Sequence, residues 1–305
     1  GLWTGVEIMA DRTRPPGAKT FLDHRLRQED AHIGKTKWNN DPMSSLVSVE
    51  VNIIDGCNRK CHFCPHAKPK IYPNRYDWKM SNQIVSIIGA QLRQIDYRGR
   101  ISMSGYGEPM LNKEVAGHIS NFRSWLPNNI IEMNTNGDPL TVANIQRVFE
   151  AGLTEMYVNL YDNKRQISHF IKMFREAGRH NYILRPHFDP DDNYGLIINN
   201  RSGIMNPKKK ALEKRCHYTF YKMFIDWNGD VLFCANDWGR NLIVGNICHS
   251  HIKDIWMSDQ MKKIRLPLAE GDRSMHPCSQ CNVNGTLHGK SSFDTLMKHY
   301  GKHPS

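Results

Sequence analysis

Residues 55–65 read Asp55-Gly56-Cys57-Asn58-Arg59-Lys60-Cys61-His62-Phe63-Cys64-Pro65, which places three cysteines at the spacing C-x3-C-x2-C. Three thiolates this close can hold three irons of a [4Fe–4S] cluster and leave the fourth iron open. An open iron can bind and activate a further ligand, which a fully coordinated electron-transfer cluster cannot do. A zinc site is the alternative from the residues alone, because Cys61 and Cys64 form a C-x2-C pair.

The chain around this motif alternates apolar strands with helix-like segments, which predicts a parallel sheet with crossover helices. We expect strands near residues 46–54, 101–104, 130–134, 156–160, 182–188 and 195–199, and helices near 81–97, 141–150 and 167–176. Six such units suit an α/β fold of the incomplete (β/α)6, TIM-like barrel type. Active sites of such sheets lie at the carboxyl ends of the strands.

The cysteine spacing resembles the signature of the radical S-adenosylmethionine (radical SAM) superfamily. In that family the open iron is chelated by the methionine part of SAM, and one electron then yields a 5′-deoxyadenosyl radical. The resemblance implies that Phe63 contacts adenine. It also implies that the stretch 105–109, Gly-Tyr-Gly-Glu-Pro, meets the methionine amino group through Gly105, Gly107 and Glu108. Tyr106, between the two glycines, departs from the family's Gly-Gly-Glu pattern.

Polar residues follow the later predicted strands and are further candidates for SAM contacts. Amide and hydroxyl side chains suit ribose hydroxyls and a carboxylate, and an arginine in an apolar strand needs an anion. Asn136-Gly137 also fits an ordinary turn, and the arginine also fits a structural salt bridge. The candidates are Asn134, Thr135, Asn136, Asn159 and Arg185.

A second cysteine set, Cys216, Cys234, Cys278 and Cys281, has the spacing C-x17-C-x43-C-x2-C. With Gly229 before Cys234 it resembles the C-terminal extension called SPASM, or its shorter twitch form, of the type found in 2-deoxy-scyllo-inosamine dehydrogenases. Four cysteines can fully ligate one auxiliary [4Fe–4S] cluster, so the resemblance implies one. Four-cysteine zinc is again the alternative.

Two residues outside these motifs are candidates for catalysis. Arg201 lies in the stretch 199–203, Asn-Asn-Arg-Ser-Gly, which recurs at this point in SPASM-type enzymes. It would hold substrate hydroxyls or help remove a proton, or it would brace the domain junction. Cys248 is left over from both sets and is either a buried small residue or a hydrogen-atom donor to a substrate radical.

Composition sets limits on size, location and partners. The 305 residues, 39% of them hydrophobic, allow one large domain or two smaller ones. We expect an N-terminal extension over 1–45, a radical SAM barrel over 46–205 and a SPASM/twitch domain over 206–305. No apolar run approaches the ~20 residues of a membrane span, so a cytoplasmic protein without a membrane partner is expected. The net charge of +11 suggests an anionic partner, but bound clusters are negative and the basic residues are dispersed, so nucleic acid is not expected.

The resemblance and the two motifs together predict a radical SAM oxidoreductase. Its cofactors would be SAM, a SAM-binding [4Fe–4S] cluster and one auxiliary [4Fe–4S] cluster, with a flavodoxin or ferredoxin as electron donor. Its substrate would be a small polar alcohol, a sugar or cyclitol, with or without phosphate. Three alternatives stay open: an epimerase using Cys248, a maturase of ribosomal peptides, and a zinc-stabilised nucleic-acid-binding protein.

Overall fold

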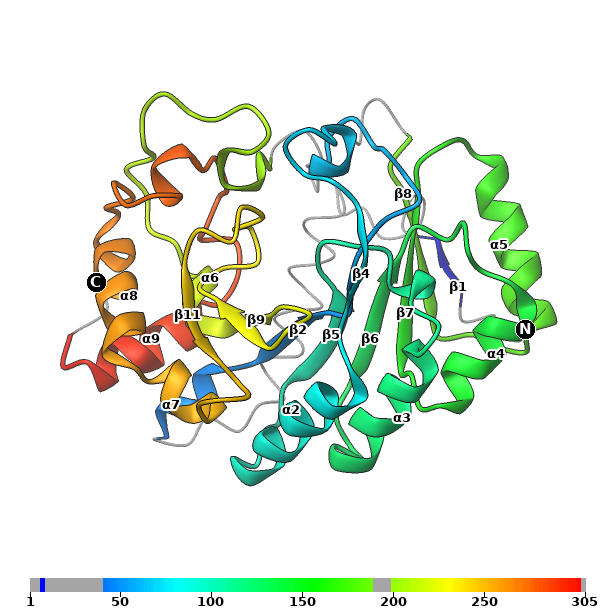
Figure 1. Cartoon of the computed structure of the whole chain (residues 1–305), viewed down its shortest axis with the longest axis horizontal. Helices are drawn as coiled ribbons and strands as arrows, with labels where there is room; N and C mark the ends of the chain where they lie inside the picture. Colours follow the sequence, from blue (N-terminus) through cyan, green and yellow to red (C-terminus); the bar gives the residue numbers. More distant parts are fainter. Residues whose placement is uncertain (1–5, 9–40, 189–198, 303–305) are drawn as a thin grey trace.

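The computed structural model describes residues 6–8, 41–188 and 199–302. Its centre is a sheet whose first six strands run in parallel in the order β1-β8-β7-β6-β5-β2 (Figure 1). The strands are β1 (Val6–Ile8), β2 (Ser48–Asn52), β5 (Arg100–Ser104), β6 (Ile131–Thr135), β7 (Glu155–Leu160) and β8 (Tyr182–Pro186).

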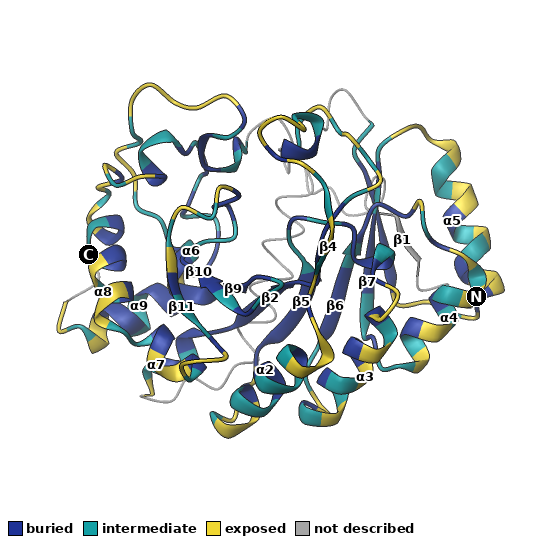
Figure 2. Cartoon of the chain, viewed as in Figure 1, coloured by how far each residue is buried: buried dark blue, intermediate teal, exposed yellow. Residues whose placement is uncertain are grey.

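Four helices lie along the outside of this curved sheet: α2 (Asn82–Gln94), α3 (Val115–Trp125), α4 (Val142–Glu150) and α5 (Arg165–Glu176). Their starts follow local capping chemistry. Ser81 accepts a hydrogen bond from the backbone of Ile84, and Thr141 and Asn144 form a capping box. In Figure 2 the strands are buried and the outward faces of the helices are exposed. The predicted α/β partial barrel is therefore confirmed.

One edge of the barrel differs from the sequence prediction. The predicted sixth strand at 195–199 falls mostly outside the described residues, and Asn199 itself is not in a strand. Val6–Ile8, within the segment expected to be an unpatterned extension, forms β1 and pairs in parallel with β8. Three residues are too few to show a period in the sequence, which is why this strand was not predicted.

The second half of the chain continues the same sheet. β9 (Lys222–Ile225) pairs in parallel with β2, and β10 (Asp230–Leu232) and β11 (Ile243–Asn246) follow in antiparallel order. Gly229 lies in the turn between β9 and β10 at a φ of +88°, a conformation that glycine adopts without strain. The remaining helices of this half are α6 (Tyr218–Tyr221), α7 (Ile252–Trp256), α8 (Asp259–Glu270) and α9 (Lys290–His299). The division near residue 206 stays a prediction, because the nine-stranded sheet crosses it.

A two-stranded ribbon stands over the carboxyl ends of the barrel strands. It consists of β3 (Ile54–Asp55) and β4 (Arg75–Lys79), and the loop between them carries the first cysteine motif. No helix in the described ranges has both the length and the apolar character needed to cross a membrane.

The contact between β9 and β2 includes a buried ion pair, which makes a prediction. Lys222 Nζ lies 2.9 Å from Glu50 Oε2, and the two side chains are 5% and 12% exposed. Lys222→Ala would leave a buried carboxylate without this partner, which costs about 3–5 kcal/mol. The matched control is Lys290→Ala, whose partner Asp294 lies on the surface and whose loss costs under about 1 kcal/mol. Thermal unfolding of the two variants should show a much larger decrease in Tm for Lys222→Ala than for Lys290→Ala. Equal decreases in Tm would contradict a stabilising role for the ion pair between Lys222 and Glu50.

Candidate active site

The first cysteine motif forms a half-buried loop at the carboxyl end of β2. Two N–H groups point at the Cys57 thiol: the backbone of Arg59 at 3.5 Å and the amide of Asn136 at 3.7 Å from Sγ. Burial raises the pKa of Cys57 to about 12 and that of Cys61 to about 11, and neighbouring thiols of the motif contribute to both shifts. Ligation of a cluster by the three thiols stays a prediction.

Arg59, inside the motif, fixes this loop above the strands. Its guanidinium makes paired hydrogen bonds to Asp138, at 2.6 and 2.7 Å, and to Asp162, at 2.7 and 2.8 Å. Asp138 follows β6 and Asp162 follows β7, so one arginine joins the loop to two neighbouring strand ends. Bidentate arginine–carboxylate pairs are the strong, directional kind of ion pair. This clamp was not predicted from the sequence, where its only signal is an acidic residue shortly after each strand.

Glu108 joins the glycine turn after β5 to the end of β6. The side chain is buried, and its carboxylate accepts hydrogen bonds from Thr135 Oγ1 at 2.7 Å and from the backbone of Asn136 at 2.7 Å. Burial raises the pKa of Glu108 to about 7, and these hydrogen bonds oppose the rise. A Cβ at Gly107 would collide with the carbonyl oxygen of Ile54, so only glycine permits this approach. Gly105 has a φ of +111°.

The polar residues of β6, β7 and β8 form a second connected set. Arg185 donates to Asn134 Oδ1 at 2.6 Å, and its guanidinium lies 3.8 Å from the centre of the Tyr157 ring. Asn159 donates to the Thr135 carbonyl at 3.2 Å and pairs with His187 at 3.0 Å. The structure thus brings the predicted polar residues together at the strand ends. Their contacts with SAM stay predictions.

Phe63 extends from the cysteine loop toward the end of β7. Its ring centre lies 5.6 Å from that of Tyr161, a residue that directly follows β7 and was not among the sequence candidates. Burial raises the pKa of Tyr161 well above its ordinary value, so its hydroxyl stays neutral. Phe63 is therefore placed beside the thiols, where the predicted contact with adenine would occur.

The second cysteine set lines a cavity. One pocket is lined by all four predicted ligands, Cys216, Cys234, Cys278 and Cys281. Two thiols already accept backbone N–H groups: Cys234 from Asn236 at 3.4 Å and Cys281 from Val283 at 3.4 Å.

Buried Arg273 also lines this cavity and fixes the chain that delivers one of the cysteines. It donates to the carbonyls of Lys214, Arg215 and Val283 at 2.7–2.8 Å. Arg273 thereby holds the segment that ends at Cys216 against the segment that follows Cys281. This role of Arg273 was not predicted, because every residue has a backbone carbonyl and the sequence does not mark which ones an arginine will bind.

Arg201 lies between the two cysteine sites. It belongs to a turn in which Arg201, Ser202 and Gly203 all have positive φ, at 51°, 50° and 98°. Ser202 lines the cysteine cavity, while the Arg201 charge lowers the pKa of Cys64, against a larger rise from burial. The guanidinium lies 5.8 Å from the Trp238 ring, and its buried Nε has no hydrogen-bond partner. Strained backbone of this kind clusters at functional sites.

Cys248 is exposed and lies just after β11. Its thiol is beside Gly229 in the β9–β10 turn, and its backbone binds Asn246. These contacts connect it to neither cysteine site, so a hydrogen-donor role stays a prediction that they do not support.

Comparison with known families agrees with both motifs. Residues 51–185 match the model of the radical SAM superfamily, and residues 216–282 match that of the SPASM iron–sulfur cluster-binding domain. The chain belongs to the radical SAM superfamily. It is a radical SAM enzyme, and the zinc-stabilised binding protein is thereby set aside.

Individual relatives are similar to most of the chain. The chain is 28% identical, over 84% of its own length and all of the relative's, to the S-adenosyl-L-methionine-dependent 2-deoxy-scyllo-inosamine dehydrogenase of Niallia circulans. It is 24% identical to a GTP 3′,8-cyclase of Microcystis aeruginosa over 65% of this chain and 62% of that protein. The crystal structure of BtrN in complex with AdoMet and 2-DOIA superposes with a TM-score of 0.67 at 26% identity, covering 80% of this chain and 96% of BtrN.

The cofactors of this radical SAM enzyme are SAM, a SAM-binding [4Fe–4S] cluster and an auxiliary iron–sulfur cluster, and the residues fit them. Within the described residues, no three or more Cys, His, Asp or Glu side chains converge as ligands of one metal ion. A single zinc ion draws four ligands to about 2.3 Å, whereas a cluster presents separate irons to separate thiolates. All four thiols of the second set line one pocket, which suits a cluster that takes one thiolate for each of its four irons.

Gly285 gives a test of the auxiliary site. A Cβ at this position would lie 2.5 Å from the Cys216 thiol and 2.6 Å from its Cα, closer than atoms pack. Gly285→Ala should therefore displace Cys216 and remove about four of eight irons, measured per chain after anaerobic reconstitution. Gly117→Ala, where the nearest atom is 3.5 Å away, is the control and should keep all the iron. Full iron in Gly285→Ala would contradict the assignment of Cys216.

Proposed function

We propose that this chain oxidises a secondary alcohol of a sugar or cyclitol to a ketone. Such an oxidation removes a hydrogen atom from carbon, a proton from oxygen and one further electron. Bound SAM with the first cluster supplies the hydrogen-atom abstraction, and the auxiliary cluster supplies the one-electron acceptor. The observation that carries the proposal is the cavity lined by four cysteines, because fully ligated clusters transfer electrons. The named dehydrogenase relative supports the substrate class.

Arg201 is the residue that we propose to hold the reacting hydroxyl. It is a cation between the loop that carries Cys57, Cys61 and Cys64, here named the SAM-cluster loop, and the pocket of the second cysteine set. Its buried Nε has a free hydrogen-bonding position. A guanidinium beside the hydroxyl stabilises negative charge on oxygen as the proton leaves. Because the turn is held by Asn199 and Asn200, with Asn200 bound to the Gln280 carbonyl beside Cys281, the cation keeps a fixed place.

Four further assignments belong to this proposal. Phe63, the glycine turn and the polar residues of β6–β8 would bind SAM. A flavodoxin or ferredoxin would supply the electron that reduces the first cluster. The protein would act in the cytoplasm, where its eight free cysteines stay reduced. The substrate would be small and polar.

The first experiment separates oxidation from its alternatives. A panel of cyclitols and aminocyclitols, deuterated at the carbinol carbons, is incubated with reconstituted enzyme, SAM and reductant. We expect one deuterium in 5′-deoxyadenosine and one ketone for each SAM consumed. The Cys248→Ala variant should give the same deuterium transfer and the same ketone yield. An inverted, unoxidised product that needs Cys248 would establish the epimerase instead. No deuterium transfer from any polyol would contradict the substrate class and favour the peptide maturase.

Arg201→Lys tests the proposed hydroxyl contact. Lysine keeps the charge but loses the planar, multi-donor guanidinium, and neither residue relieves the positive φ. We expect kcat/KM for alcohol oxidation to fall about 100-fold, while SAM cleavage without substrate changes less than about twofold. A parallel loss of both activities would show that Arg201 acts on SAM or on the domain junction.

A further inference from the structure

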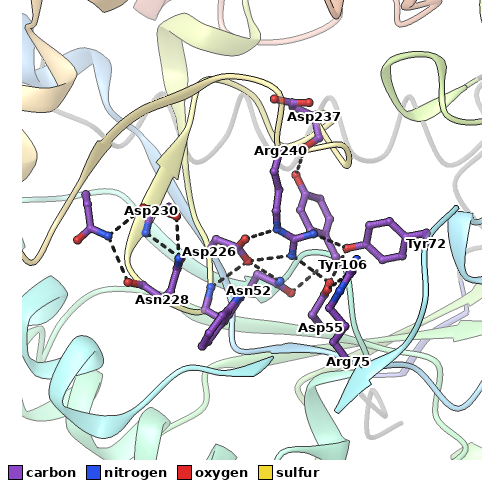
Figure 3. Close-up of polar contacts among 12 residues, drawn as sticks. Asn52, Asp55, Tyr72, Arg75, Tyr106, Asp226, Asn228, Asp230, Asp237 and Arg240 are labelled. Atoms are coloured by element: carbon purple, nitrogen blue, oxygen red, sulfur yellow. Dashed lines mark hydrogen bonds and ion pairs between the residues drawn. The ribbon is translucent and has the colours of Figure 1, made fainter. Parts of the chain in front are cut away.

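A buried charged cluster joins the two halves of the molecule (Figure 3). At its centre is Arg240, from the loop between β10 and β11. Its Nε lies 2.5 Å from Asp226 Oδ2 and its Nη2 lies 3.1 Å from Asp55 Oδ1. Both carboxylates are essentially unexposed, at 2% and 0%. Because buried carboxylates require a cationic partner, the place of Arg240 is tied to both.

Asp55 connects this cluster to the SAM site. It stands two residues before Cys57, at the end of β3, and also binds the Tyr72 hydroxyl at 2.5 Å and Arg75 at 3.0 Å. Arg240 in turn donates to the Tyr72 hydroxyl at 2.9 Å. The root of the SAM-cluster loop is therefore held by a cation that the auxiliary half supplies.

Tyr106 makes a second connection, from the SAM-binding turn itself. Its backbone N–H donates to Asn52 at 3.0 Å, and its carbonyl lies 2.6 Å from His66 Nε2. The side chain leaves the turn and enters the auxiliary half, where the hydroxyl donates to the Asp237 carbonyl at 2.9 Å and the ring lies 4.5 Å from that of Trp238. The residue that departs from the family's Gly-Gly-Glu pattern thus has a specific partner.

In the auxiliary half, both connections lead to the segment that follows Cys234, a predicted cluster ligand. The backbone of Asp237 donates to the carbonyl of Cys234 at 3.0 Å, and the Asp237 carboxylate accepts from Leu242 at 2.9 Å and Asn241 at 2.6 Å. The segment 234–240 therefore runs from a thiolate ligand to Arg240 as one hydrogen-bonded loop. Ligation of Cys234 would fix one end of this loop. Arg240 lies at the other end, and Tyr106 contacts Asp237 and Trp238 between them.

We propose that Arg240 and Tyr106 are positioning residues that make SAM affinity at the first cluster depend on occupancy of the auxiliary site. A loaded auxiliary site holds the 234–240 loop, which places Arg240 on Asp55 and anchors Tyr106. An unloaded site leaves that loop with fewer constraints, and the SAM-binding turn loses its support. The coupling is reciprocal, so SAM also raises the stability of the auxiliary site. It involves no substrate and so stands apart from the proposed alcohol oxidation.

The test is SAM binding, not turnover. Holoenzyme with oxidised clusters is dialysed against labelled SAM under anaerobic conditions, so that no SAM is cleaved. The comparison protein carries Cys278→Ala and Cys281→Ala, which leave the first cluster loaded. We expect the Kd for SAM to rise about tenfold or more when the auxiliary site is empty. The same Kd in both proteins would overturn the proposal.

Variants then locate the coupling. Tyr106→Phe removes one hydroxyl and Arg240→Gln removes the cation. For each variant, the Kd for SAM is measured with and without the auxiliary cluster. We expect these two Kd values to differ less than about threefold. Arg75→Gln is the matched control, since Arg75 reaches Asp55 from β4 within the barrel half, and it should keep the tenfold difference.

Tyr106→Phe keeps the test valid if Arg240→Gln does not fold. Iron and sulfide per chain confirm that each variant is loaded as intended. If the tenfold difference in Kd is retained in both Tyr106→Phe and Arg240→Gln, these residues only stabilise the fold, and the assignment is overturned. Loss of coupling in Arg75→Gln as well would also overturn it, because the effect would then not come from the auxiliary half.

Discussion

Two buried carboxylates, Asp55 and Asp226, share the guanidinium of Arg240, and much of the molecule is arranged around that pairing. Removing one partner of such a group costs about 3–5 kcal/mol, a large part of the stability of a domain. Asp226 directly follows β9, the strand that pairs with β2, and Asp55 lies just before the SAM-cluster loop. Because the same cation satisfies both, the continuous sheet and the position of the loop are fixed together.

The parallel sheet explains why the site could assemble from distant residues. Parallel strands place their carboxyl ends at one edge, so the turn after β5 and the ends of β6, β7 and β8 meet there. Glu108, Arg59 and Arg185 then link neighbouring ends through hydrogen bonds of 2.6–2.8 Å. Each link joins a different pair of elements, so the SAM-cluster loop rests on an already ordered surface. Such prior order is what positioning for radical chemistry requires.

Local sequence predicted most strands and helices, because strand alternation and helix caps are short-range signals. β2, β5, β6, β7 and β8 lie where the apolar runs indicated. The long-range polar contacts gave no such signal. Arg59 meets Asp138 and Asp162 across 79 and 103 residues, and nothing local marks which acidic residue will be its partner. The same holds for Arg240 with Asp55, and for Tyr106, which the sequence showed only as a departure from the family pattern.

Iron and sulfide per chain after anaerobic reconstitution, followed by SAM, dithionite and quantification of 5′-deoxyadenosine, test the central claim of two cooperating cluster sites most directly. Two [4Fe–4S] clusters predict about eight irons with reductive cleavage of SAM. About four irons with cleavage would remove the auxiliary cluster and with it the electron acceptor for alcohol oxidation. Zinc in place of iron, without cleavage, would contradict the whole account.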